Sequence, residues 1–344
     1  MQNSANGRGG GTYNYRGSPV LTNCTFSNNS GWSDGGGIHS SHGSPSMTDC
    51  TFIGNSSRQG GGAYSDDNSA TFINCTFTKN LAEDEGGGLY SQDNKPNLNN
   101  CTFIENSAQY GGGGMCCNSS DPNMTDCTFM ENSAHYGGGM YNMSSNPILT
   151  NCILIANSGF TYGGGMYNIS SSLTLKNCII AANQAYSYGG GMSCNSSDSN
   201  ITNCTFTENS ATKGKTIACN SPGQRRQSDI ILTNCILWDD GNAIWKNDRS
   251  TVTIFYSNIK GGWEGEGNID ADPLFSDFDN GDYHLKSQAG RWDPVSESWM
   301  IDEETSPCID AGDPKSPVLF EPFPNGGIIN MGAYGGTSVA SKSP

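Results

Sequence analysis

The chain repeats itself every 25 or 26 residues over most of its length. A cysteine recurs at this spacing inside the frame Leu-Thr-Asn-Cys-Thr-Phe-x-x-Asn, as at residues 21–29. A short polar turn follows, then Gly-Gly-Gly, an apolar residue and often Tyr. Near-copies at a fixed period are the signature of a solenoid, in which each repeat packs only on its neighbours. The cysteines of this column are Cys24, Cys50, Cys75, Cys101, Cys127, Cys152, Cys178 and Cys204, and Cys235 follows after one longer repeat.

The Cys-Thr-Phe step indicates a strand, because alternate residues of a strand share one face. Cys24 and Phe26 should therefore point into the solenoid and Thr25 outward. The triple glycine suits a sharp bend that requires a positive φ or a close approach of two backbones. The apolar residue after it returns to the interior, so we expect two or three short strands in each coil. An asparagine column, which begins at Asn29, should form a ladder of side-chain amides between coils.

Leucine-rich repeats are the main rival, because their period and their Leu-x-x-Leu-x-Leu-x-x-Asn frame overlap with this pattern. The other half of each repeat disfavours them, since residues 137–147 hold three glycines and a proline and could hardly form a helix. With 34% hydrophobic residues and 46 glycines, a large globular core is excluded. We predict an all-β fold, a right-handed parallel β-helix solenoid of about nine coils of 25–26 residues, with an irregular C-terminal cap.

The repeat frame decays after residue 241, although residues 251–256 still alternate as a strand does. We expect residues 1–258 to form the parallel β-helix repeats and residues 259–344 to form an irregular cap segment. An open solenoid end exposes unpaired backbone groups and an apolar cross-section, which such a segment should cover.

The N-terminal residues lack the charged and apolar regions of a signal peptide, and residues 3–11 already match the middle of a repeat. We infer that the chain begins inside a longer solenoid or that an export signal has been removed. No run of 18 apolar residues predicts a membrane-spanning helix. The net charge of −16 would repel nucleic acid and anionic membranes, so neither is expected as a partner.

The Phe-x-x-Asn and Gly-Gly-Gly-[Ile/Met] motifs resemble the FxxN and GGAI repeats of polymorphic outer membrane proteins. Those are surface-displayed bacterial passenger domains with a β-helix fold, and several are adhesins, so the resemblance implies a secreted or cell-surface bacterial protein. Residues 306–312 and 329–334 look like the C-terminal segment of secreted bacterial β-helix proteins, although Asn330 and Gly335 stand where that segment has Asp and Glu. The Phe-x-x-Asn pairs are Phe26/Asn29, Phe52/Asn55, Phe77/Asn80, Phe103/Asn106, Phe129/Asn132 and Phe206/Asn209.

The cysteine column is expected to be a stack of buried thiols, because parallel side chains one strand apart fit the disulfide dihedral poorly. A second group of cysteines follows the glycines. Cys194 and Cys219 hold equivalent places in adjacent coils, which leaves a disulfide open there.

An aromatic residue often follows the inward residue after the glycines, and it should point outward. Such a stripe along a rigid rod is the best candidate for ligand binding, to a sugar chain or to another rod. The alternative is a self-stacked ladder that stabilises neighbouring strands. The stripe consists of Tyr13, His39, Tyr64, Tyr90, Tyr141 and Tyr167.

No catalytic residues are predicted. Polysaccharide lyases and glycoside hydrolases also use this fold, but a lyase needs a base with a cation and a hydrolase needs two carboxylates flanking one bond. No cofactor is implied except calcium, which prefers oxygen ligands of the kind offered by Asp272, Asp277, Asp279 and Asp282. The alternative there is a plain turn-rich loop.

The leading hypothesis is a noncatalytic extracellular or cell-surface β-helix rod with a structural or adhesive role. Its partners would be itself, through end-to-end or lateral assembly into fibres, or a surface polysaccharide. The alternative is a polysaccharide-binding or polysaccharide-degrading protein, that is, a lyase or a hydrolase. The sequence names neither the ligand nor the oligomeric state.

Overall fold

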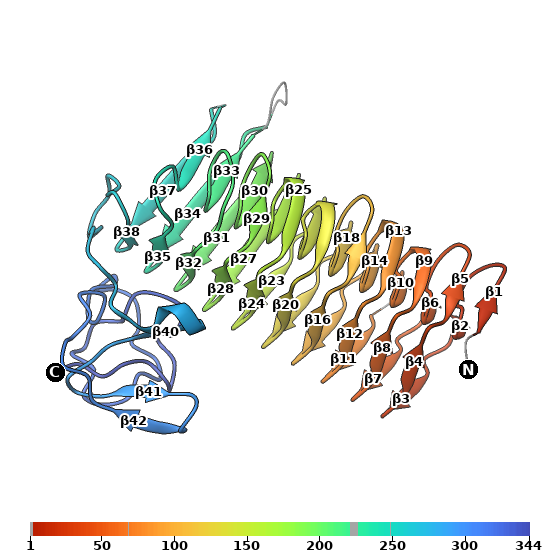
Figure 1. The fold of residues 1–344 in the computed structure, drawn as a ribbon, viewed down its shortest axis with the longest axis horizontal. Helices are drawn as coiled ribbons and strands as arrows, with labels where there is room; N and C mark the ends of the chain where they lie inside the picture. The colour runs from red at the N-terminus through yellow and green to blue at the C-terminus, as the bar shows by residue number, and fades with distance from the viewer. Residues whose placement is uncertain (1–2, 68, 221–225, 248) are drawn as a thin grey trace.

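The computed structural model describes residues 3–67, 69–220, 226–247 and 249–344, and it is a rod of stacked coils with an irregular segment at one end (Figure 1). Each strand of the rod pairs in parallel with the equivalent strand of the next coil, 25 or 26 residues away in the regular part. Within the described residues, three sheets have ten strands and a fourth has eight, so the rod has ten coils where the sequence predicted about nine.

The first eight coils contain four short strands each, rather than the two or three expected, and the last two coils contain three. The four sheets are called A to D in chain order.

Sheet A consists of β1 (Ser4–Ala5), β5 (Ser30–Gly31), β9 (Ser56–Gln59), β13 (Leu81–Glu85), β17 (Ser107–Ala108), β21 (Ser133–Tyr136), β25 (Ser158–Tyr162) and β29 (Gln184–Ala185). Sheet B consists of β2 (Thr12–Tyr15), β6 (Ile38–Ser41), β10 (Ala63–Asp66), β14 (Leu89–Gln92), β18 (Met115–Asn118), β22 (Met140–Met143), β26 (Met166–Ile169), β30 (Met192–Asn195), β33 (Ile217–Cys219) and β36 (Ile244–Lys246).

Sheet C consists of β3 (Val20–Thr22), β7 (Ser46–Thr48), β11 (Thr71–Ile73), β15 (Asn97–Asn99), β19 (Asn123–Thr125), β23 (Ile148–Thr150), β27 (Ser172–Lys176), β31 (Asp198–Thr202), β34 (Asp229–Thr233) and β37 (Thr251–Phe255). Sheet D consists of β4 (Thr25–Ser27), β8 (Thr51–Ile53), β12 (Thr76–Thr78), β16 (Thr102–Ile104), β20 (Thr128–Met130), β24 (Ile153–Ile155), β28 (Ile179–Ala181), β32 (Thr205–Thr207), β35 (Ile236–Trp238) and β38 (Asn258–Ile259).

The interior is built from columns of identical side chains. The cysteine column is buried from Cys50 onward, and the phenylalanines of sheet D stack face to face, with ring centroids 4.6 Å apart between Phe77 and Phe103. Thr25 points outward, as predicted. The columns confirm the predicted inward and outward faces of the Cys-Thr-Phe step.

The asparagine ladder is confirmed as well. The Oδ1 of Asn132 accepts hydrogen bonds from both the backbone N–H and the Nδ2 of Asn106, each at 3.0 Å. The same Nδ2 of Asn106 also donates to the carbonyl of Phe77 at 2.9 Å. The ladder satisfies backbone groups at a corner where the sheets diverge, which would otherwise be buried without partners.

The ladder ends on a buried carboxylic acid, Asp239, in place of an asparagine. Its Oδ1 accepts the backbone N–H of Asn209 at 2.7 Å, and its Oδ2 accepts the hydroxyl of Thr216 at 2.5 Å. Burial raises the pKa of Asp239 to about 6, against the opposing effect of the hydrogen bonds from Thr216 and Asn209. The folded state therefore binds the proton more tightly than the unfolded chain, whose aspartate pKa is about 3.9.

The substitution Asp239→Asn should stabilise the protein at pH 8. Because the folded pKa is the higher one, wild-type stability is lost as pH rises from about 4 through about 6, and an amide avoids that loss. We expect a gain on the order of 2 kcal/mol at pH 8 that disappears by about pH 4. Urea unfolding at both pH values measures it, and the neighbouring exposed Asp240, changed to Asn, is the control. A gain that is the same at both pH values would contradict the role of the raised pKa.

The C-terminal segment, residues 260–344, contains two small antiparallel pairs and lies against the flank of the rod beside sheet D (Figure 1). The pairs are β39 (Phe275–Asp277) with β40 (Asp282–Leu285), and β41 (Arg291–Asp293) with β42 (Ser298–Met300), and the 3₁₀ helix η1 (Phe278–Asn280) precedes β40.

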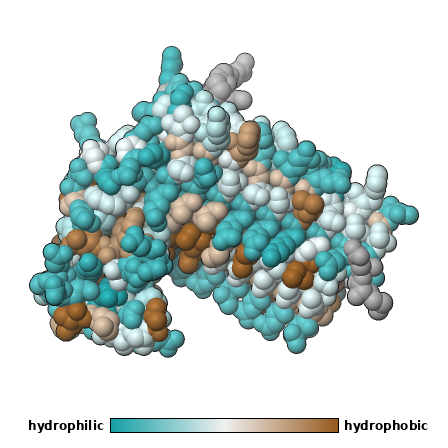
Figure 2. Space-filling view, viewed as in Figure 1, coloured by the Kyte–Doolittle hydropathy of each residue, from teal (hydrophilic) through white to brown (hydrophobic). Residues whose placement is uncertain are grey.

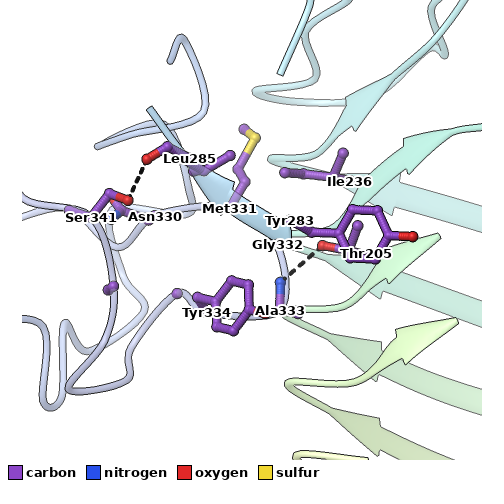
Figure 3. A pocket seen from close by; sticks show the side chains of 12 residues that line it. Thr205, Ile236, Tyr283, Leu285, Asn330, Met331, Gly332, Ala333, Tyr334 and Ser341 are labelled. Carbon is purple, nitrogen blue, oxygen red and sulfur yellow. Dashed lines mark hydrogen bonds between the residues drawn. The ribbon is translucent and has the colours of Figure 1, made fainter. Parts of the chain in front are cut away.

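Hydrophobic and polar contacts both fasten this segment to sheet D. Ile179 and Ile236 occupy outward positions of sheet D and pack in one buried cluster with Met331. Figure 3 shows that the backbone N–H of Ala333 donates to the hydroxyl of Thr205, at 3.0 Å. The space left between the two surfaces is about 10 Å³, room for roughly one water molecule.

The position of the cap differs from the one expected. Most of the segment covers the flank of sheet D, and only its beginning reaches the end of the rod, where Trp263 packs against the main core. The described part of the chain contains no helix long and apolar enough to cross a membrane.

Candidate functional site

The aromatic stripe on sheet B is a buried ladder, which corrects the expectation that its rings would be exposed. Tyr13 is 49% exposed, but the other five residues are at most 8% exposed. Neighbouring rings stack: the ring centroids of His39 and Tyr64 lie 4.9 Å apart with an interplanar angle of 7°. The buried members are His39, Tyr64, Tyr90, Tyr141 and Tyr167.

A second layer of side chains covers this ladder. Tyr136 and Tyr162, at the corner between sheets A and B, pack on it from outside. Burial raises the pKa of Tyr64 and Tyr90 well above the ordinary tyrosine value. Burial, together with the charge of Arg8, lowers the pKa of His39 to about 4. Rings that are held this way offer no stacking face to a ligand, so the ladder alternative fits five of the six residues.

The cysteine pair in sheet B is aligned as expected but is not oxidised. Cys194 and Cys219 are register partners in adjacent strands, and all fourteen cysteines of the chain are thiols. Parallel side chains on neighbouring strands do not meet the geometry that a disulfide requires, which corrects the open alternative.

The four aspartates predicted as a calcium site serve local turns and ion pairs instead. Asp272 accepts the backbone N–H of Leu274, and Asp277 accepts the side-chain amide of Asn280. Asp279 is exposed, and Asp282 binds His284. In the residues that the structure describes, no group of three or more His, Cys, Asp or Glu side chains could hold a metal ion.

The exposed aromatic rings of the rod lie on sheet A, in a column that sequence reasoning missed. His135, Phe160 and Tyr186 occupy equivalent outward positions in successive coils; we call them the sheet A column. Phe160 is 64% exposed and Tyr186 is 73% exposed. Their ring centroids lie 6.0 Å apart with an interplanar angle of 9°, and the His135 ring lies 5.2 Å from Phe160.

A shallow hollow of about 320 Å³ adjoins this column. Its floor includes Ala108 and Ala134, whose small side chains point toward the interior. The hydroxyls of serines along its edge alternate with the aromatic column across the strands. No Asp, Glu, Lys or Arg lines it. The lining serines are Ser107, Ser133 and Ser158.

A second hollow, here called the C-terminal cleft, has a volume of about 670 Å³ and lies within the C-terminal segment. Strands β40 and β41 supply its polar wall, with Asp282 and His284 from β40 and Arg291 from β41. Trp292 and Tyr334 supply its aromatic walls. Residues two apart on a strand share a face, which is why Asp282 and His284 meet.

His284 is held rigidly from two sides. Its Nδ1 lies 2.6 Å from Oδ1 of Asp282, and its ring stacks on Tyr334 with centroids 3.6 Å apart. Burial would raise the pKa of Asp282, but the hydrogen bonds that His284 donates outweigh it and lower that pKa. Asp282 is therefore an ionised acceptor that fixes the proton of His284 on Nδ1.

The charges around the cleft are mostly negative. Arg291 is buried between two carboxylates, with its Nη1 3.7 Å from Asp282 and its Nε 3.2 Å from Asp302. Asp277 and Asp293 also line the cleft. Arg291 is thus occupied by the protein itself, and the cleft offers more acceptors than donors.

Comparisons with known proteins agree with the fold. A family model described as right-handed β-helix region matches residues 61–225, and one described as disaggregatase related matches residues 201–312. The crystal structure of pectate lyase Pel9A is similar, with a TM-score of 0.46 and 11% sequence identity, covering 92% of this chain and 88% of that chain. No curated protein matches.

The parallel sheets and the first family match together define the chain as a right-handed parallel β-helix. The finer resemblance to polymorphic outer membrane protein repeats stays a prediction.

Proposed function

We propose that the protein is a noncatalytic, extracellular β-helix rod that binds a neutral polysaccharide along the outer face of sheet A. The observation that carries the proposal is the sheet A column, in which Phe160 and Tyr186 expose stacked rings to solvent although the chain buries its other long aromatic ladder. Large exposed aromatic rings side by side are a feature of interaction sites.

The chemistry of this face suits a sugar chain. A pyranose ring has an apolar face of C–H groups that can stack on Phe160 or Tyr186, and it has hydroxyls that can pair with serine side chains. Because no ionised side chain lines the adjoining hollow, and the whole chain carries a charge of −16, a neutral polysaccharide fits better than an acidic one.

The rod also holds the binding groups in place before a ligand arrives. The strands that carry the sheet A column, β21 and β25, are hydrogen-bonded to each other and to the next coil. A ligand would therefore lose little affinity to ordering of the protein. An extracellular location agrees with the burial of nearly all thiols, which would protect them from oxidation.

The double variant Phe160→Ala/Tyr186→Ala should bind polysaccharide at least about tenfold more weakly than wild type, because both stacking surfaces are removed. Affinity electrophoresis in gels that contain soluble glucans, mannans or xylans measures this. Tyr13→Ala is the matched control, since it removes a half-exposed ring from sheet B and should leave mobility unchanged.

Two results would count against the proposal. One is wild-type mobility that none of these neutral polysaccharides retards. The other is retardation that the double variant retains in full.

A further inference from the structure

The C-terminal cleft holds a buried nitrogen atom without a partner. His284 is 3% exposed, and its Nε2 has no hydrogen-bond partner among the residues that the structure describes. Since Nδ1 carries the proton that Asp282 accepts, Nε2 of the neutral ring has a free lone pair and is an acceptor. A buried acceptor without a donor costs free energy, on the order of 1–3 kcal/mol, which a ligand could recover.

The other polar groups of the cleft also accept rather than donate. Asp277 and Asp293 bring carboxylates to it, and the donors that face them belong to neighbouring side chains of the same segment, Asn280 and Ser296. The guanidinium of Arg291 is already paired with two carboxylates. A site of this composition should prefer a ligand that brings hydrogen-bond donors and positive charge.

The walls of the cleft define the shape of the ligand. Trp292 stands on β41 and pairs with Trp299 across the hairpin, with ring centroids 5.6 Å apart. Met300, which is 45% exposed, and Val295, which is 92% exposed, add apolar surface at the rim. An aromatic face can bind both the C–H face of a sugar and an adjacent ammonium group.

We infer that the C-terminal cleft is a second binding site, separate from sheet A, for a saccharide that carries a protonated primary amine, such as a glucosamine oligomer. The ammonium group donates to Nε2 of His284 and is neutralised by Asp277 and Asp293, while a sugar ring lies on Trp292. The inference rests on the proposed function only for the choice of a sugar as the occupant.

Isothermal titration of the full chain with a glucosamine hexamer and with an N-acetylglucosamine hexamer tests this inference. The two probes share rings and linkages but differ in charge. We expect the glucosamine hexamer to bind at least about tenfold more tightly, and its affinity to fall as salt is raised. Equal affinities for the two hexamers would overturn the inference.

Variants locate the binding. His284→Phe keeps a ring for Tyr334 to stack on and removes the acceptor, and Asp293→Asn removes a partly exposed charge at small risk to folding. Each should weaken binding of the glucosamine hexamer by about tenfold. Asp279→Asn is the matched control, because it removes an exposed carboxylate of the same segment that does not line the cleft. If Asp279→Asn and Asp293→Asn weaken binding equally, the attraction is general and the site is absent.

Two further arms separate the alternatives. Tetralysine that displaces the glucosamine hexamer at equal concentration would show that the cleft takes a basic peptide, and the sugar assignment would be wrong. The sheet A variant Phe160→Ala/Tyr186→Ala should bind the glucosamine hexamer as wild type does. The cleft can thus fail while sheet A binds neutral polysaccharide, and the reverse can also be seen.

Discussion

Gly138→Ala should disrupt the middle of the rod. An alanine Cβ at this position would lie 2.4 Å from the carbonyl oxygen of Ser158 and 2.6 Å from its nitrogen, which belong to the backbone of the next coil. A backbone cannot yield as a flexible side chain can, so the two coils must separate locally. We expect a loss of at least about 3 kcal/mol in the free energy of unfolding.

The loss should also change the cooperativity of unfolding. Coils of a solenoid contact only their neighbours, so a weak junction allows the two halves to unfold separately. Urea unfolding followed by circular dichroism should show two transitions for Gly138→Ala, and hydrogen exchange should place the earliest opening near β21 and β25. The control is Gly17→Ala, where the nearest atom to the added Cβ is Cδ of Pro19 at 3.9 Å. A single wild-type transition for Gly138→Ala would contradict the clash.

The triple glycine shows why the sequence predicted so much of the fold. Gly137 has a φ of +58°, whereas Gly138 and Gly139 lie against backbone oxygens of the next coil. Both reasons, positive φ and close approach, follow from the residue type alone. The Cys, Phe and Asn columns were equally predictable, because each inward position repeats one residue type at a fixed spacing.

The sheet A column was missed because its position carries no repeated residue type. The equivalent positions of neighbouring coils hold Arg58, Glu83, Gln109, His135 and Phe160, so self-alignment shows only a variable turn. The sheet B stripe was misjudged for a related reason. Alternation places Tyr141 and Tyr167 outward from their strand, but whether the corner tyrosines cover them depends on packing between sheets, which alternation does not describe.

The docking of the C-terminal segment did leave a signal in the sequence. The outward threonine of the Cys-Thr-Phe step becomes isoleucine at Ile153, Ile179 and Ile236, on the part of sheet D that the segment covers. An apolar residue at a position that is otherwise polar predicts a covering element. The C-terminal cleft left only the Asp282-x-His284 spacing, because the burial of His284 depends on Tyr334, fifty residues away.

Phe103→Ala should have the largest effect of any single truncation in the rod. Phe103 is fully buried, and its ring stacks on those of Phe77 and Phe129, each at 4.6 Å between centroids. Removal of the ring leaves a cavity between rigid coils, with an expected cost of about 3–5 kcal/mol in the free energy of unfolding. Phe103→Leu should cost less than about 1.5 kcal/mol, since Leu154 holds the same column position in another coil.

The exposed Phe160 gives the opposite pattern and is the matched control. Phe160→Ala should change the free energy of unfolding by less than about 0.5 kcal/mol in urea, because the ring contacts mostly solvent and a few surface neighbours. The same variant should lose affinity for polysaccharide, whereas Phe103→Leu should keep it. Two phenylalanines in the same solenoid would then separate stability from binding. A Phe160→Ala variant as unstable as Phe103→Ala would show that the sheet A column supports the rod rather than binds a ligand.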